Sequence, residues 1–191
     1  MKPTGAALGF KLHTGWAAVV AVANAPGNIR ILLRRRLELL PAGKTLPRFA
    51  YHAAAELPER DAFELLERVT AACRVTTQAA LQQLLTELHS QHISVAAAGI
   101  PTGSTKLPES LASILRSHTL IHTAEGRLFQ QAVVAACEGQ GLNVICPTER
   151  AMWSTLGSDV REKLDGLRKT VGSPWGADQK TATAAALMAL R

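Results

Sequence analysis

Three short apolar runs near the N-terminus have the spacing of β-strands. The pattern predicts strands over residues 6–13 and 16–23, joined by a tight turn at Thr14-Gly15. A third strand is predicted over residues 29–39, where apolar and polar positions alternate imperfectly. Because strands that follow one another through short connections usually pair side by side, the three runs predict an antiparallel meander.

The next part of the chain alternates between helical periodicity and short apolar runs. A helix is predicted from Pro58 to His92, and the β-branched residues near its middle mark either a break or a helix held by packing. Residues 93–101 and 141–147 are apolar runs of the kind typical of buried parallel strands. Between them, helix in two parts is expected from Pro108 to Gly139.

The order of these elements predicts one mixed α/β sheet. Three strands are followed by helix, strand, helix, strand and a last helix over residues 179–190, and parallel neighbours need helical crossovers. We therefore expect a five-stranded sheet, three antiparallel strands and then parallel ones, with helices on both faces. The length of 191 residues suits a single domain over residues 1–191.

Composition narrows the classes of function. Hydrophobic residues make up 47% of the chain, which is enough for a core. Aromatic residues make up only 4%, which argues against a protein that binds single-stranded nucleic acid by stacking the bases on aromatic side chains. Cys73, Cys137 and Cys146 are widely spaced in apolar sequence, so neither a disulfide framework nor a zinc site is expected. The sequence has no long apolar segment, which predicts a cytoplasmic location and no membrane partner.

The net charge of +6 fits a polyanionic partner. The cations gather only once along the chain, at Arg34, Arg35 and Arg36. Solvated arginines that protect the edge of a sheet would explain the same run. Both interpretations fit the residues.

Three motifs resemble a known superfamily. They are LGFKLHTGWAAVV over residues 8–20, VAAAGIP over residues 95–101 and ADQKTATAAALMAL over residues 177–190. Together with the order of elements, they resemble the ribonuclease H-like superfamily and, within it, the RuvC-type Holliday-junction resolvases. The resemblance covers most of the chain and implies the mixed sheet predicted above.

The chain departs from this family where the family binds metal. RuvC-type nucleases gather three or four carboxylates around two divalent cations that cleave a phosphodiester. Here Lys11 stands at the position of the first aspartate, and residues 96–98 of the central strand are alanines. Only Asp178 falls where the family has an acid. The resemblance therefore implies no standard two-metal nuclease, and Mg²⁺ or Mn²⁺ is expected as cofactor only if catalysis persists.

Lys11 and His13 are two positions apart, so they point to the same side of the first strand. If that side meets the start of the last helix, four polar residues share one concavity and form the candidate site: Lys11, His13, Asp178 and Lys180. Lys11 would then neutralise a phosphate or pair with Asp178. Glu149 follows a parallel strand at the edge where such sheets carry their sites. The competing interpretations are a strand end in solvent and an aspartate that only caps its helix.

A second group lies at His118, His122 and Glu125. Their spacing places all three on one face of a helix, where two histidines can bind a metal and the glutamate can act as third ligand or as base. A helix–helix contact explains the same residues, and we expect no metal site. Glu125 stays a candidate acid, because Ala-Glu-Gly lowers helix propensity without a local reason. If so, Glu125→Gln should abolish Mg²⁺- or Mn²⁺-dependent cleavage and leave folding intact.

These features predict a nucleic-acid-associated, resolvase-like protein that is non-catalytic or has an altered site. The candidate catalytic residues are Lys11, His13, Glu125 and Asp178. The candidate nucleic-acid-binding residues, expected to form one positive surface together with Lys11, are Arg34, Arg35, Arg36, Lys106 and Lys180. The alternative is a structural or interaction module that binds a protein partner or forms a homodimer, which predicts exposed apolar surface.

Overall fold

The structure is a computed structural model that describes residues 4–25, 28–43 and 45–191. Its strands are β1 (Thr4–His13), β2 (Trp16–Ala25), β3 (Asn28–Glu38), β4 (Ile93–Gly99) and β5 (Asn143–Ile145). Its helices are α1 (Ala50–Ala55), α2 (Glu59–Ser90), α3 (Leu111–Leu115), α4 (His118–Gly139), α5 (Glu149–Leu156), α6 (Ser158–Gly166), α7 (Arg168–Val171) and α8 (Ala177–Ala189).

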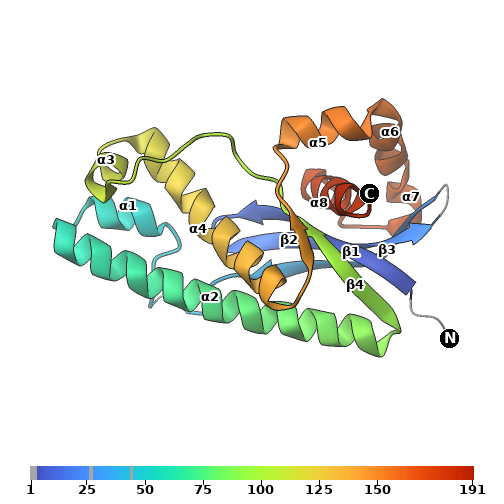
Figure 1. The fold of residues 1–191 in the computed structure, drawn as a ribbon, viewed down its shortest axis with the longest axis horizontal. Coiled ribbons are helices and arrows are strands. Elements are labelled where there is room, and N and C mark those ends of the chain that lie inside the picture. Colours follow the sequence, from blue (N-terminus) through green and yellow to red (C-terminus); the bar gives the residue numbers. More distant parts are fainter. Residues whose placement is uncertain (1–3, 26–27, 44) are drawn as a thin grey trace.

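The five strands form one mixed sheet in the order β3-β2-β1-β4-β5 (Figure 1). β1 pairs antiparallel with β2, and β2 pairs antiparallel with β3. β4 lies parallel to β1, and β5 lies parallel to β4. The predicted α/β class and mixed five-stranded sheet are confirmed, although β5 has three residues where the apolar run predicted seven.

The helices differ from the expectation mainly in continuity. α2 runs for 32 residues without a break through the β-branched stretch near its middle. Packing explains this, because Thr77 is fully buried there and lies 3.8 Å from the sulfur of Cys73. The predicted two-part helix before β5 is confirmed as α3 and α4. None of the described helices combines the length and apolarity needed to cross a membrane.

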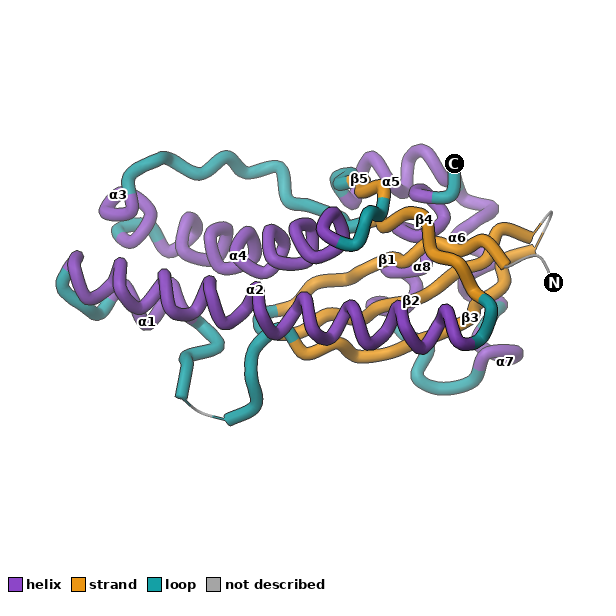
Figure 2. The backbone as a smooth tube through the Cα atoms, turned by 60° about the horizontal axis from the view of Figure 1, so that its bottom comes forward, coloured by secondary structure: helices purple, strands orange, loops and turns teal. Residues whose placement is uncertain are grey.

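Different helices cover the two faces of the sheet. α2 and α4 pack on one face with the even-numbered side chains of β1, such as Leu8 and Phe10, in the main core, and α1 lies between these two helices beyond the strands (Figure 1). α8 packs on the other face with Ala7, Val20 and Val22, opposite α2 (Figure 2), and is itself covered by α5 and α6. Alternation along β1 therefore turns Lys11 and His13 toward the α8 side.

α8 lies very close to the sheet because two strands present glycine to it. A Cβ added at Gly9 of β1 would lie 1.7 Å from the carbonyl oxygen of Ala182. A Cβ added at Gly99 of β4 would lie 2.0 Å from the carbonyl oxygen of Ala185. This close approach places the first turn of α8, with Asp178, beside the carboxyl end of β1.

The three thiols are expected to differ sharply in reactivity. Burial raises the pKa of all three thiols, that of Cys73 to about 11 and that of Cys137 to about 12, but the side chain of Cys146 alone of the three is exposed to solvent. Because the thiolate is the reactive form, a disulfide reagent at mildly alkaline pH should modify one thiol per native chain and all three after unfolding. Cys146→Ser should abolish the native reaction. Modification of a second thiol in the native chain would contradict the described core.

Candidate functional site

Two charged pairs lie at the carboxyl end of β1, on the α8 side of the sheet. Lys11 Nζ donates a hydrogen bond to Oε1 of Glu149, the first residue of α5, at 3.1 Å. His13 Nε2 lies 3.0 Å from Oδ2 of Asp178 in the first turn of α8. The predicted convergence of β1 with the start of the last helix is thus present. Lys11, however, pairs with Glu149 rather than with Asp178.

The His13–Asp178 contact is close, but its angle is not that of a hydrogen bond. Within the part of the chain that the structure describes, the buried His13 Nε2 has no hydrogen-bond partner. The His13 ring instead stacks on Trp16 with centroids 4.1 Å apart and planes 6° apart. The guanidinium of Arg36 lies 3.9 Å from the Trp16 ring centroid, a cation–π contact. Arg36, Trp16 and His13 therefore form a stack that leads to Asp178.

Helix capping does not explain Asp178. α8 begins at Ala177, so Gly176 is the N-cap and Asp178 is the second residue of the helix. Gln179 serves the helix start instead, since its Oε1 accepts a hydrogen bond from the Gly176 N–H at 2.9 Å. The interpretation of Asp178 as an N-cap is wrong. Lys180, the fourth predicted member of the site, pairs with Asp165 of α6.

The residues at this sheet edge do not fit the two divalent cations that the resemblance to RuvC-type nucleases would imply. Each of the two acids there, Glu149 and Asp178, already has a basic side chain of β1 about 3 Å away. An ammonium group beside a carboxylate occupies electrostatically the place that a cation would take. We therefore derive no metal-dependent hydrolysis from this edge.

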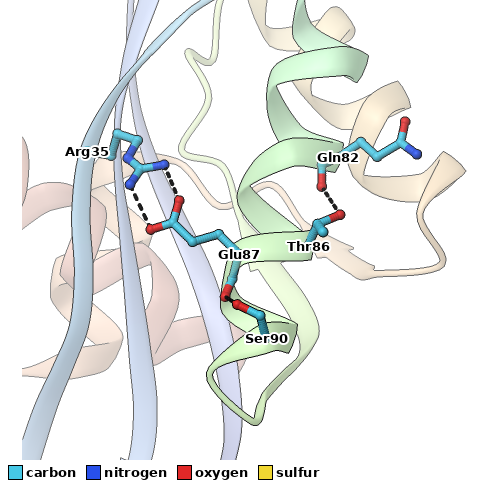
Figure 3. A network of polar contacts seen from close by, with 5 residues as sticks. All are labelled: Arg35, Gln82, Thr86, Glu87 and Ser90. Atoms are coloured by element: carbon cyan, nitrogen blue, oxygen red, sulfur yellow. Dashed lines mark hydrogen bonds and ion pairs between the residues drawn. The ribbon is translucent and has the colours of Figure 1, made fainter.

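The three consecutive arginines do not share one free surface. Arg35 faces α2 and forms two hydrogen bonds with Glu87, at 2.6 and 2.8 Å, which lower the pKa of that carboxyl (Figure 3). Arg34 lies on the α8 side and donates to three backbone carbonyls of residues 171–174. Arg36 pairs with Glu38 beside Trp16. Lys106, the remaining predicted cation, is exposed in the loop after β4.

Glu125 lies on the other side of the sheet, in α4. Its side chain is only 4% exposed, and it accepts hydrogen bonds from the N–H groups of Ala50 at 2.7 Å and Tyr51 at 3.3 Å. A third contact joins its Oε2 to Nδ1 of His52 at 3.0 Å. Burial, and then the charge of Glu125, raise the pKa of the Tyr51 hydroxyl. The carboxylate thus holds the start of α1, and it does not join Lys11 and Asp178.

The sequence pattern did not include one residue that the structure brings to α4. His52 of α1 contacts both His118 and His122, with ring centroids 5.8 and 4.7 Å away. Nothing in the local sequence signals this contact, because the two helices are joined by a long stretch of intervening chain. Next to it, a pocket of about 250 Å³ opens between α4 and the loop after β4, and His122, Arg127 and Gln130 contribute to its wall.

Comparisons with known proteins identify the fold. No family model and no curated protein matches the sequence. Among solved structures, RuvC of T. thermophilus in complex with a Holliday junction substrate aligns with a TM-score of 0.51 and 16% identity, covering 97% of this chain and 90% of that one. A second Thermus thermophilus RuvC structure aligns at 0.50 and 14%, covering 95% and 90%. The chain has the ribonuclease H-like fold of the RuvC Holliday-junction resolvases.

Proposed function

We propose that the protein binds nucleic acid on a RuvC-type scaffold and does not cleave it by a two-metal reaction. The observation that carries the proposal is the hydrogen-bonded ion pair of Lys11 with Glu149 at the sheet edge, where Asp178 in turn lies beside the His13 ring. Two-metal cleavage needs carboxylates that are free to bind cations. Here the same edge carries Lys11 and the Arg36–Trp16–His13 stack instead.

The charge of the chain supports a polyanionic ligand. The net charge is +6, and Lys106 and Arg127 lie on the loop and helix that border the pocket beside β4. Arg127 donates a hydrogen bond to the Thr105 carbonyl at 3.3 Å, which orders this loop. Phosphate groups bound by such cations release counterions, so binding depends on salt. We assign Arg36 and Lys106 as the first residues to test.

The test measures binding and cleavage of a four-way DNA junction and of a duplex of the same sequence. Fluorescence anisotropy should show affinity that falls linearly on logarithmic axes as salt rises. Arg36→Ala and Lys106→Ala should each reduce the slope by about one. Arg60→Ala, which removes an exposed arginine paired with Glu64 on α2, is the matched control and should leave the slope unchanged. Neither substrate should be cut in Mg²⁺ or Mn²⁺.

Two results would contradict the proposal. Metal-dependent cleavage by the wild-type chain would show that the paired acids still support hydrolysis. Affinity that is insensitive to salt, or absent for both substrates, would remove the nucleic-acid role itself.

Exposed apolar side chains favour a second candidate, a module that binds a protein partner or a second copy of the chain. Phe49, Leu57 and Phe63 are 53%, 41% and 57% exposed, and all three lie at or near the ends of α1 and the start of α2. Large exposed apolar side chains that gather in one region favour an interface. An average molecular mass in solution that rises with protein concentration, together with an absence of DNA binding by the same preparations, would favour this interaction module.

A further inference from the structure

Three histidines from two helices converge at one end of the molecule. His118 and His122 lie one turn apart at the start of α4, and His52 reaches them from α1. One ring nitrogen from each histidine lies within 4.8 Å of the other two. Among the described residues, this is the group of metal-binding side chains that comes close enough to share an ion.

Glu125 orients the His52 ring in the way that metal sites use. An ionised carboxylate only accepts hydrogen bonds, so the proton of the 3.0 Å contact sits on Nδ1 of His52. The Nε2 lone pair of His52 is then free to bind an ion. The carboxylate is itself fixed by two backbone N–H groups of α1. A metal-binding histidine typically donates its other N–H to such a carboxylate.

We propose that His52, His118 and His122 bind one Zn²⁺ ion, with the fourth position open to water. Neutral imidazole nitrogens suit Zn²⁺, and three histidine ligands with one open position are an established zinc geometry. Zn–N bonds of about 2.0–2.1 Å in a tetrahedron bring the nitrogens to about 3.3 Å from one another. His118 and His122 are exposed, so small rotations of their rings close the remaining distance.

The alternative for these rings is packing without an ion. The three rings meet edge to face, an arrangement that aromatic contacts favour on their own. Packing does not account for two of the three rings being open to solvent. The cluster lies on the opposite face of the sheet from Lys11 and Asp178, but His122 also lines the pocket that Lys106 and Arg127 border. Zn²⁺ binding measured without nucleic acid therefore tests this proposal separately from the proposed function.

The experiment titrates the untagged chain with Zn²⁺ by calorimetry and with Co²⁺ by visible absorbance, which reports a four-coordinate site. One ion should bind per chain. At a hundredfold excess over the dissociation constant, Zn²⁺ should raise the Tm by about 5–10 °C, because the ion ties α1 to α4. His118→Ala and His122→Ala should each weaken binding at least about tenfold and remove most of the Tm shift.

Two further variants separate a metal site from packing and from adventitious binding. His52→Asn keeps an N–H donor for Glu125 but removes the ligand, so it should fold and lose Zn²⁺ affinity. His89→Ala removes an exposed histidine of α2 outside the cluster and should bind Zn²⁺ like the wild-type chain. Equal affinity in all four variants, or no binding by the wild-type chain, would overturn the proposal.

Discussion

Replacing Gly9 with alanine is expected to lower the free energy of unfolding by about 3–5 kcal/mol, or to prevent folding altogether. The added Cβ would lie 1.7 Å from the carbonyl oxygen of Ala182 and 2.5 Å from the backbone nitrogen of Ala186. Both atoms belong to the backbone of α8, so no side-chain rotation relieves the overlap, and the helix must move away from the sheet. That movement also separates Asp178 from His13.

Gly5→Ala is the matched control for this effect. Gly5 belongs to the same strand, yet a Cβ added there meets nothing within 4 Å. Its midpoint of urea denaturation, followed by circular dichroism, should stay close to that of the wild-type chain. Gly99→Ala should resemble Gly9→Ala, because its Cβ would lie 2.0 Å from the Ala185 carbonyl oxygen. Equal midpoints for Gly5→Ala and Gly9→Ala would contradict the close contact of α8 with β1.

The sheet could be predicted from the sequence because local patterns of apolar and polar residues define its strands. Apolar runs separated by turns and helical stretches fix which strands exist, and crossover rules then fix which neighbours are parallel. The alternation of β1 also predicted that Lys11 and His13 share a side, and the structure places both beside acids. Lys11 pairs with Glu149 instead of the expected Asp178 because α5 begins above this edge of the sheet. The position of α5 relative to the sheet cannot be predicted from the local sequence.

Two other features required the tertiary structure. Alternation along β3 places Arg35 on one face of the sheet and Arg34 and Arg36 on the other. Which residues they contact there, such as Glu87 of α2 for Arg35, depends on how the helices pack. The position of each partner along its own helix could not be read from the run itself. The same limit applies to His52, whose contact with α4 depends on how α1 packs and not on any spacing along the chain.

Glu125→Ala is expected to lower the free energy of unfolding by about 3–5 kcal/mol, because it removes a buried charge on which two backbone N–H groups and His52 depend. Glu125→Gln, which keeps one acceptor, should cost less. Glu138→Ala is the matched control, since Glu138 is an exposed glutamate of the same helix and should change the urea midpoint little.

A catalytic role and an anchoring role for Glu125 predict opposite results for Glu125→Gln. If Glu125 is a catalytic acid, Glu125→Gln should abolish cleavage without an effect on stability. If Glu125 anchors α1, the same substitution should lower the urea midpoint and leave DNA binding by the folded fraction unchanged. Tyr51, the single tyrosine of the chain, gives an independent readout by absorbance. Because the charge of Glu125 contributes to its raised pKa, the tyrosine should ionise at lower pH in Glu125→Gln than in the wild-type chain. An unchanged urea midpoint in Glu125→Ala, with an unchanged tyrosine titration in Glu125→Gln, would leave the anchoring role without support.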